Sequence, residues 1–133
     1  MSGLPFARPQ RILVVEDDEL LSSALKQGLE AAGYDVMAAG NGKQAIRLYL
    51  QNSFDLVLAD IFMPDMDGLE LIGALRKNDP KLRIIAMSGG GLFQPDACLR
   101  AAELMGATGT LTKPFKLSDL VRMVEGEAGK FAQ

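Results

Sequence analysis

Residues 56–60 read Leu-Val-Leu-Ala-Asp, an apolar run that ends abruptly in a carboxylate. The run is too short for a helix, and it lacks the alternation of a strand with one face in water. It is typical of a strand in a parallel sheet, where helices cover both faces. Residues 56–59 therefore predict a buried strand, and Asp60 marks the edge at which it ends.

Similar apolar runs recur on both sides of this strand and alternate with helical patterns. We expect further strands at residues 12–15, 36–39, 82–87 and 108–112. Between them, apolar residues at three- and four-residue spacing predict amphipathic helices, with Gly33 ending the first and Asn41 and Gln44 opening the second as a capping box. The apolar faces are expected to contain Leu20, Leu21, Ala24, Leu25, Gly28, Leu29 and Ala32; Ala45, Ile46, Tyr49 and Leu50; Leu69, Ile72 and Leu75; Ala97, Cys98, Ala101, Ala102 and Met105; and Leu117, Leu120, Val121 and Val124.

Five strand-helix units in succession predict an α/β fold, a parallel sheet with helices on both faces, because right-handed crossovers place them there. Five units are too few to close an eightfold barrel, and no G-x-G-x-x-G motif follows the first strand to indicate dinucleotide binding. The first ten residues show no periodicity. We expect a flexible lead-in over residues 1–10 and one domain over residues 11–130.

The composition excludes several classes of protein. The chain has 133 residues, no histidine, one cysteine and a formal net charge of -3. Without histidine it offers no His-ligated zinc or copper site, no Ser-His-Asp triad and no phosphohistidine of its own. Scattered lysines and arginines predict no direct nucleic-acid binding, and no apolar stretch reaches the roughly 20 residues that cross a bilayer. The lone Cys98 and the lack of a secretory leader favour a cytoplasmic location.

Polar side chains stand at the carboxyl ends of four expected strands, the edge at which open α/β sheets bind their ligands. Glu16 and Asp17 follow the first strand, and Asp60 ends the third. Ser88 follows the fourth strand and Lys113 follows the fifth. The sequence therefore predicts one cluster of acids, a hydroxyl and an amine.

Three crowded carboxylates repel each other by about 1 to 4 kcal/mol per close pair unless a cation lies between them. Mg²⁺ fits this need, since it binds through one or two carboxylates and keeps waters that a phosphate can displace. Ser88 and Lys113 supply donors for phosphoryl oxygens. The set predicts phosphoryl transfer in which Asp60 is the nucleophile and forms an acyl phosphate.

Each of these residues also has a simpler interpretation. Asp18 is explained as well by an N-cap of the following helix as by a role in the cluster. Taken alone, Asp60 is consistent with a turn residue, Ser88 with an ordinary loop and Lys113 with a solvated side chain. The hypothesis of phosphoryl transfer rests on their joint placement at four strand ends.

Four short motifs contain these residues: residues 12–18 (ILVVEDD), 60–68 (DIFMPDMDG), 88–89 (SG) and 113–115 (KPF). In this order and spacing they resemble the receiver domain of bacterial two-component response regulators. The resemblance covers about residues 10 to 130. It implies a flavodoxin-like, doubly wound sheet with strand order 2-1-3-4-5.

The resemblance implies a role for each acid. Asp60 is expected to accept a phosphoryl group from a sensor histidine kinase or a histidine phosphotransfer protein, which agrees with the absence of histidine here. Asp17, Asp60 and the backbone carbonyl of Phe62 are expected to bind Mg²⁺. Glu16 is expected to act mostly through water. Such a domain catalyses only its own phosphorylation and dephosphorylation.

The family's switch also involves residues of the last two strands. Lys113 is expected to contact the phosphoryl group, and its bond to Pro114 is expected to be cis. The Ser88 hydroxyl is expected to move toward the phosphoryl group, while an aromatic residue three positions before the lysine turns with it. This chain has Thr110 there. Either a smaller rearrangement suffices, or output runs through another element.

Two further features depart from the common pattern. Phe62 stands two positions after Asp60, where a bulky ring is expected to exclude water and slow the loss of phosphate, although passive packing explains it equally well. Glycines at residues 89–91, with Gln94 and Pro95 after them, predict a slightly long loop. That loop is either a mobile element that compensates for Thr110 or a tolerated insertion.

The chain leaves no length after its last helix for an output domain, so we expect a stand-alone receiver that signals by binding a downstream protein. Leu21, Pro114 and Phe115 border the site and are candidate docking residues, although packing also explains them. Three alternatives remain open: a fragment of a longer regulator, a receiver that binds partners without phosphate, and a Mg²⁺-dependent phosphatase or mutase. The last would use a second aspartate where this chain has Phe62.

Overall fold

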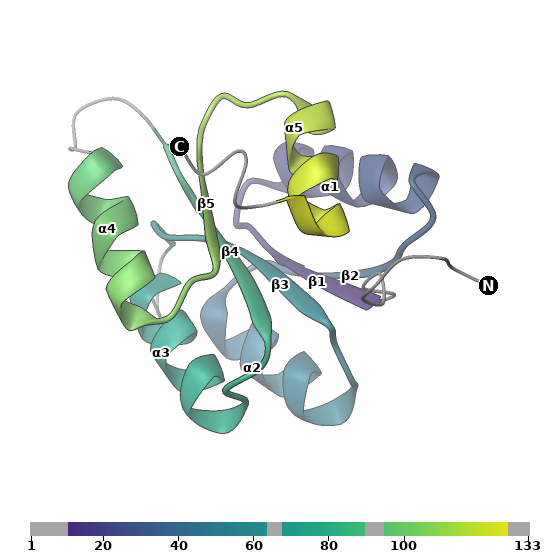
Figure 1. Cartoon of the computed structure of the whole chain (residues 1–133). Coiled ribbons are helices and arrows are strands. Elements are labelled where there is room, and N and C mark those ends of the chain that lie inside the picture. Colours follow the sequence, from purple (N-terminus) through teal and green to yellow (C-terminus); the bar gives the residue numbers. More distant parts are fainter. Residues whose placement is uncertain (1–10, 64–67, 90–94, 128–133) are drawn as a thin grey trace.

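The computed structural model describes residues 11–63, 68–89 and 95–127, and within them five strands alternate with five helices (Figure 1). The strands are β1 (Arg11–Val15), β2 (Asp35–Ala39), β3 (Leu56–Asp60), β4 (Arg83–Ser88) and β5 (Gly109–Thr112). The helices are α1 (Glu19–Ala31), α2 (Gly42–Gln51), α3 (Gly68–Asn78), α4 (Pro95–Met105) and α5 (Leu117–Arg122), which continues into a wider turn, η1 (Met123–Glu127). The expected lead-in over residues 1–10 and residues 90–94 of the glycine-rich loop lie outside the described residues.

The five strands form one parallel sheet in the order β2-β1-β3-β4-β5, which confirms the predicted fold class. The central strand is β3, and Val57 pairs with Leu13 of β1 on one side and with Ile84 of β4 on the other. Because all strands point the same way, residues 16, 60, 88 and 113 share one edge of the sheet.

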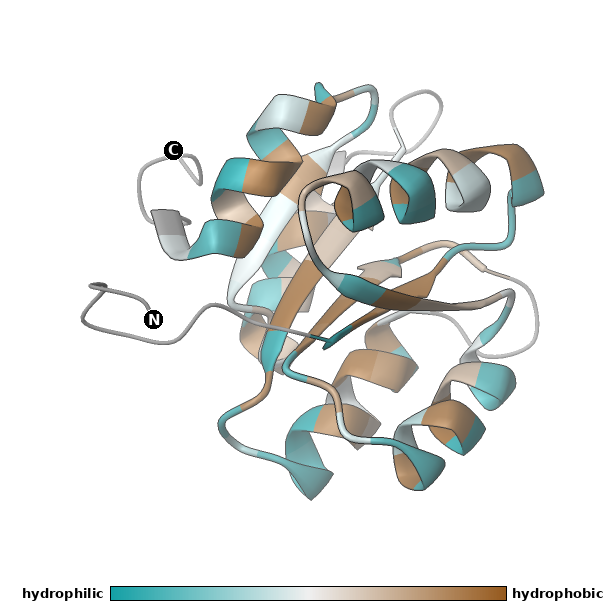
Figure 2. Ribbon diagram, turned by 90° about the vertical axis from the view of Figure 1, so that its right-hand side faces the viewer, coloured by the Kyte–Doolittle hydropathy of each residue, from teal (hydrophilic) through white to brown (hydrophobic). Residues whose placement is uncertain are grey.

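Helices cover both faces of the sheet (Figure 1). Leu56 and Leu58 of β3 lie in a core with α1 and α5, while Val57 and Ala59 lie in a core with α2, α3 and α4. All four side chains are buried, and Figure 2 shows the apolar strands enclosed between helices with polar outer surfaces. Burial on both faces explains why β3 reads as an unbroken apolar run.

The expected helix ends are present, with one change. Gly33 follows α1 with a φ of +102°, a backbone conformation that suits glycine at a helix C-terminus. Asn41 caps α2 by accepting a hydrogen bond of 2.8 Å from the Gln44 N–H. The Gln44 side chain accepts from the Gly40 N–H at 2.7 Å, so the reciprocal bond of the expected capping box goes to the residue before the cap.

Several residues that the helical pattern placed on apolar faces are exposed, and those predictions were wrong. Leu20 is 85% exposed and Leu50 is 69% exposed. Leu50 follows the buried Ala45 by five positions, about 140° around a helix, so it points away from the sheet. Leu20 lies in the first turn of α1, beside the site edge. The other exposed residues of the predicted faces, among those whose side chains the structure describes, are Ala24, Ala97, Met105 and Leu117.

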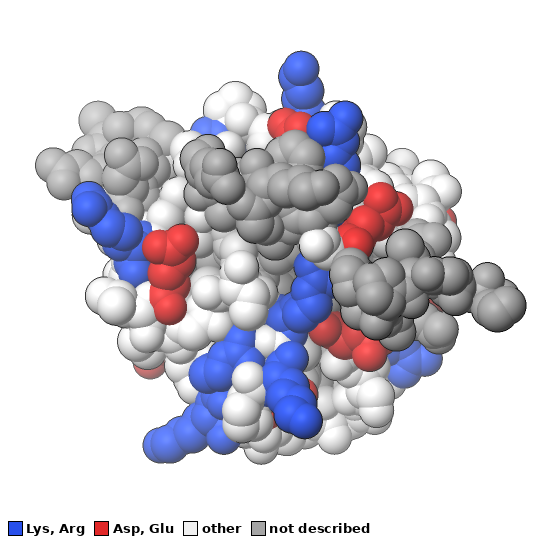
Figure 3. Space-filling view, viewed as in Figure 1, with Lys and Arg blue, Asp and Glu red and all other residues white. Residues whose placement is uncertain are grey.

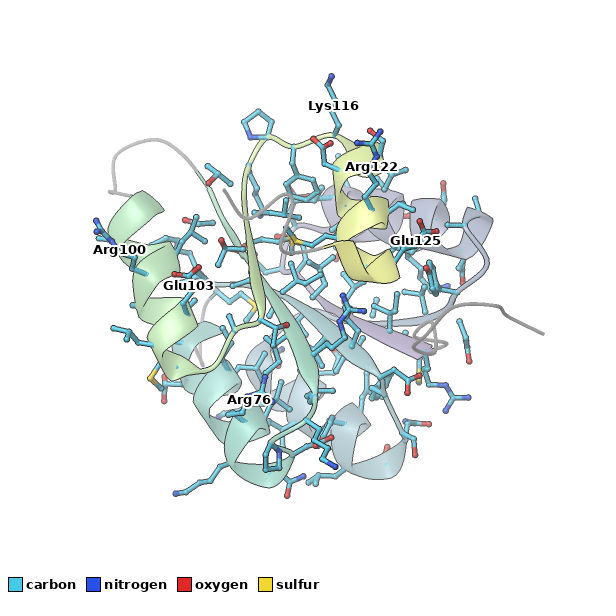
Figure 4. All side chains as sticks on the ribbon, viewed as in Figure 1. Arg76, Arg100, Glu103, Lys116, Arg122 and Glu125 are labelled. Atoms are coloured by element: carbon cyan, nitrogen blue, oxygen red, sulfur yellow. The ribbon has the colours of Figure 1, made fainter. Side chains whose placement is uncertain are left out.

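Two arginines hold helices to neighbouring elements at the edge of the sheet opposite the acids. Arg76, labelled in Figure 4, donates from Nη2 to the carbonyl of Gly106, just after α4, at 2.7 Å. Arg83, at the start of β4, donates to the carbonyls of Met123 and Val124, both at 2.7 Å.

In the view of Figure 3, charges of both signs are spread over the surface, and basic side chains gather toward the lower edge, away from the carboxyl ends of the strands.

No helix in the described part of the chain has the length and hydropathy needed to cross a bilayer.

Candidate functional site

The three predicted acids meet at the carboxyl ends of β1 and β3. Val15 pairs with Ala59, so Glu16 and Asp60 emerge from neighbouring strands. One carboxylate oxygen from each of Glu16, Asp17 and Asp60 lies within 4.8 Å of the others. Glu16 and Asp60 are buried, whereas Asp17 is exposed. The acids therefore form a cluster that is closed toward the core and open to solvent on the side of Asp17.

Lys113 supplies the positive charge of this cluster. Its Nζ donates to Glu16 Oε1 at 2.7 Å and to Asp60 Oδ2 at 3.2 Å. The Lys113 backbone N–H donates to the Ser88 carbonyl at 2.7 Å, which extends the β4–β5 pairing beyond β5. The Lys113–Pro114 bond is cis, as expected. A single ammonium thus neutralises part of the charge of two buried carboxylates.

Burial and ion pairing shift the pKa values of Glu16 and Lys113. Burial raises the pKa of Glu16 above its ordinary value and outweighs the opposing bonds from Lys113 and the Asp18 N–H. Burial alone would lower the pKa of Lys113, but its bonds to Glu16 and Asp60 outweigh burial and raise it. The site therefore holds a charged lysine beside an acid whose ionisation is disfavoured, which suits a site that receives an external cation.

A pH dependence follows from the raised pKa of Glu16. Without divalent metal, the free energy of unfolding is expected to fall as pH rises from about 4.5 toward neutrality, relative to that of Glu16→Gln. The folded state holds the Glu16 proton more tightly than the unfolded chain does. Protonated Glu16 therefore stabilises the folded state at low pH, and this stabilisation is lost as Glu16 ionises. Urea unfolding of both proteins across this range measures it. If the difference in free energy of unfolding between the wild type and Glu16→Gln stays constant with pH, or if the wild type gains stability relative to the variant as pH rises, the raised pKa of Glu16 is contradicted.

Ser88 and Phe62 lie at the same edge but engage other partners. Ser88 is fully buried, and its hydroxyl donates to the Gly89 carbonyl at 3.3 Å. The Phe62 backbone N–H donates to Asp60 Oδ1 at 3.2 Å, and the Phe62 side chain is 41% exposed. Asp60 thus accepts from Phe62 on one oxygen and from Lys113 on the other, which fixes the plane of its carboxylate.

Asp18 is the N-cap of α1, which was the simpler of the two interpretations of this residue. Its Oδ1 accepts from the N–H groups of Leu20 and Leu21 at 3.0 and 3.2 Å, as an N-cap of α1 does. Its own backbone N–H donates to Glu16 Oε2 at 3.1 Å. Asp18 therefore contacts the acidic cluster through its backbone N–H, while its carboxylate caps the N-terminus of α1.

Sequence reasoning did not single out Gly68, the first residue of α3. Its N–H donates to the Ile61 carbonyl at 2.8 Å. A Cβ at this position would lie 2.5 Å from Ile61 Cα and closer still to the carbonyl oxygen of Asp60. The backbone of α3 therefore packs directly against the turn that holds Asp60 and Phe62. A glycine in a loop motif gives no hint of this contact, because it depends on how α3 crosses the end of β3.

Comparison with known proteins identifies a shared domain. The family model described as the response regulator receiver domain matches residues 12–125. The response regulator receiver protein CpdR of Brucella abortus is 38% identical over 116 residues, which are 87% of this chain and 94% of that protein. The DNA-binding transcriptional regulator NtrC of Azospirillum brasilense is 40% identical over 114 residues. This chain spans 23% of the length of that relative.

Solved structures agree with the fold. A CheY-like response regulator receiver domain protein from Methanospirillum hungatei superposes with a TM-score of 0.82 at 29% identity. The match covers 92% of this chain and 95% of that one. The sheet order and the helices on its two faces are therefore those of known receiver domains.

Proposed function

The chain belongs to the family of response regulator receiver domains, and from this premise we propose that Asp60 accepts a phosphoryl group from a phosphohistidine of a partner protein. The domain is proposed to extend over residues 11–130. One observation carries the proposal: Asp60 stands at the end of the central strand, among two further acids and a lysine. A receiver domain is a phosphoryl-accepting signalling domain rather than an enzyme that acts on other substrates.

Receiver domains bind Mg²⁺ at an acidic site, and the residues present here fit that ion. Asp17 and Asp60 offer hard carboxylate oxygens, and the exposure of Asp17 leaves room for water and phosphate. We propose that Asp17, Asp60 and the carbonyl of Phe62 hold Mg²⁺, with Glu16 acting mostly through water. When bound, the ion neutralises charge on the carboxylates and on the incoming phosphoryl oxygens.

Asp60 is proposed to act as the nucleophile. A carboxylate oxygen attacks phosphorus, the bond between phosphorus and the imidazole nitrogen of the partner breaks, and the electron pair returns to the ring. An acyl phosphate forms on Asp60. Lys113 already lies 3.2 Å from Asp60 Oδ2, so its ammonium is in place to donate to a phosphoryl oxygen. Ser88 is proposed to turn from the Gly89 carbonyl toward the same group.

An apolar groove beside Lys113 supports a place for the partner. Leu21 of α1 lines one side, and Pro114 and Phe115 line the other. Its volume is about 710 Å³. We propose that the sensor histidine kinase or phosphotransfer protein rests here while its histidine reaches Asp60, since apolar grooves accept amphipathic helices.

Output is proposed to be binding of a downstream protein. Phosphorylation adds a charge of about -1.5 to -2 and strong acceptor oxygens, which bias a two-state surface. The position of the usual aromatic ring carries a small polar side chain in this chain, Thr110 of β5. Thr110 pairs with Ala86 of β4 and is partly exposed. A smaller rearrangement or another element must then report the phosphoryl group.

Intact-mass measurement tests the proposal. Incubation with a small acyl phosphate donor and Mg²⁺ is expected to add one phosphoryl group, and chelation of the metal is expected to prevent it. A phosphohistidine-bearing phosphotransfer protein serves as a second donor, because some receivers take phosphate only from a protein partner. An unmodified mass with both donors, or an adduct equally abundant without metal, would overturn the proposal.

Phe62 is expected to prolong the life of the acyl phosphate. Phe62 stands two positions after Asp60 and its backbone N–H donates to Asp60 Oδ1, so a polar, smaller side chain at this position should admit water to the phosphorus more readily. Phe62→Asn is therefore expected to shorten the half-life several-fold, whereas Phe62→Leu, which keeps an apolar side chain, should change it less. Decay of the intact-mass adduct after removal of the donor measures both. A half-life unchanged or lengthened in Phe62→Asn would refute the shielding role.

A further inference from the structure

We propose that Gly28 is a specificity residue for the protein donor, because its lack of a side chain lets Leu117 pack against α1 and leaves the apolar groove beside Lys113 open. The inference rests on the proposed function, since this groove is where the protein donor is proposed to rest. Three features of the molecule carry it: the position of Gly28 on α1, its contact with Leu117, and the way in which α5 begins.

Gly28 lies on the face of α1 that lines the groove. The lining residues of this helix are Leu21, Ala24 and Leu25, and Gly28 continues their spacing of i, i+3, i+4 and i+7. Gly28 is also an interior residue of α1, where every residue except proline forms a helix more readily than glycine. Helix formation alone therefore disfavours glycine at this position, and its role depends on the element that packs against it.

Leu117 of α5 occupies the space that a side chain at position 28 would take. The helices α1 and α5 lie side by side on one face of the sheet (Figure 1). A Cβ on Gly28 would lie 2.5 and 2.8 Å from the two methyl carbons of Leu117 and 3.2 Å from its Cγ. Such distances are too short for carbon atoms that are not bonded to each other. The Leu117 side chain therefore packs directly on the backbone of α1, and even one methyl group at position 28 would displace it.

The first turn of α5 depends on this packing. Lys116, at the N-cap of α5, makes no side-chain capping hydrogen bond, so no cap fixes where the helix begins. Leu117 is the first helical residue, lines the groove and is 43% exposed. Pro114 and Phe115, which line the groove opposite Leu21, precede it directly in the chain. The contact with Gly28 therefore positions both Leu117 and the segment that leads into it.

An alanine at position 28 is expected to narrow the groove. The added methyl group lies on the lining face of α1, and the displaced Leu117 side chain turns into the space that it already lines, because α1 closes its other side. A small acyl phosphate does not need the groove, since Asp60 is not part of the groove lining. A protein donor does need it. The substitution should therefore discriminate between the two donors.

Two measurements on the unphosphorylated protein test the packing and the groove. In the wild type, NMR spectra should show NOE contacts between the Gly28 Hα protons and the Leu117 methyl groups. The uncharged apolar dye N-phenylnaphthylamine is the probe of the groove, and its binding should shift the methyl signals of Leu21, Leu25 and Leu117. Gly28→Ala is expected to bind the dye about fivefold more weakly or worse, since overpacking opposes binding. A wild type that binds no dye at these methyl groups, or equal dye affinity in Gly28→Ala, would overturn the proposal.

Gly73→Ala is the matched control. It is the same substitution in an interior helix position, and its added Cβ also meets a flexible side-chain end, the terminal methyl of Met105. Met105 lies outside the groove lining, so Gly73→Ala should leave dye binding unchanged. Gly28→Ala is expected to fold, because alanine favours the helix. If it does not, Leu117→Phe replaces it, since its ring is too large for the space above Gly28 and should also narrow the groove.

Phosphoryl uptake from two donors measures specificity. With a small acyl phosphate, Gly28→Ala should match the wild type. With a phosphohistidine-bearing phosphotransfer protein that phosphorylates the wild type, uptake by Gly28→Ala should be about fivefold slower or worse. The double variant with Leu117→Ala should be no slower than Leu117→Ala alone, because no large side chain then remains for the added methyl group to displace.

The outcomes separate this inference from the proposed function. An equal loss with both donors, no loss with the protein donor, or losses that multiply in the double variant would overturn the role of Gly28. If the wild type takes up phosphate from neither donor, the proposed function fails. The NMR and dye measurements then still decide whether Gly28 lets Leu117 pack against α1 and leaves the groove open.

Discussion

Replacement of Asp60 by asparagine is expected to abolish phosphoryl uptake while stabilising the metal-free protein. Asp60 is 5% exposed and shares its site with Glu16 and Asp17. Asparagine removes two repulsive pairs and one attractive pair with Lys113, so we expect a net gain of about 1 kcal/mol in the free energy of unfolding. The amide nitrogen leaves a single acceptor oxygen and no carboxylate to form an acyl phosphate.

Mg²⁺ is expected to reverse the order of stability. A ligand at 100 times its dissociation constant stabilises the folded state by about 2.7 kcal/mol, and the wild type should gain far more of this than Asp60→Asn. Urea unfolding in chelator and in Mg²⁺ measures both effects. Asp35→Asn is the control, because it removes the same charge at the opposite edge of the sheet. An Asp60→Asn protein that Mg²⁺ stabilises as much as the wild type would contradict the account of the site.

Gly68→Ala is expected to destabilise the protein by about 1–3 kcal/mol and to weaken Mg²⁺ binding. In an ordinary helix position the change should stabilise, since alanine is the better helix former by about 1 kcal/mol. Here the added methyl group meets the backbone of Asp60 and Ile61, neither of which is a flexible side-chain end. The turn that holds the Asp60 carboxylate and the Phe62 carbonyl must therefore shift.

The matched control lies in the same helix. At Gly73 an added Cβ would lie 2.8 Å from the terminal methyl of Met105, a flexible side-chain end that can move aside. Gly73→Ala should therefore be close to neutral in stability and leave Mg²⁺ affinity unchanged. Chemical unfolding and Mg²⁺ titration of both variants check the contrast. Equal effects of the two substitutions would show that the contact between Gly68 and Asp60 has no special role.

The fold was predictable because its signals are local. The run at residues 56–59 is apolar since both of its faces are buried, and the acids at strand ends share one edge because the strands are parallel. The exposure of Leu50 was missed because Leu50 follows Ile46 at helical spacing, although it lies about 140° around α2 from the buried Ala45. Which of these two positions marks the centre of the buried face depends on how α2 packs against the sheet.

The candidate site was predictable in its members but not in its bonds. Glu16, Asp60 and Lys113 come together as expected, yet strand order alone separates Glu16 from Lys113 by two strands. Glu16 and Lys113 meet because both side chains are long enough to cross that gap, and only the three-dimensional structure shows this contact. In the same way, the approach of Gly68 to Asp60 depends on the path of the chain into α3. Contacts of this kind are set by three-dimensional geometry rather than by sequence pattern.

Chemical trapping of the phosphorylated residue tests the central claim most directly. Borohydride reduces an acyl phosphate to an alcohol, which converts the aspartate that carries it into homoserine. After phosphorylation, reduction and trypsin digestion, fragment spectra of the peptide that spans residues 48–76 locate the changed residue. With Asp60 as the phosphoryl acceptor, homoserine is expected at position 60. Homoserine at another aspartate, or a phosphorylated protein that borohydride leaves unchanged at position 60, would contradict it.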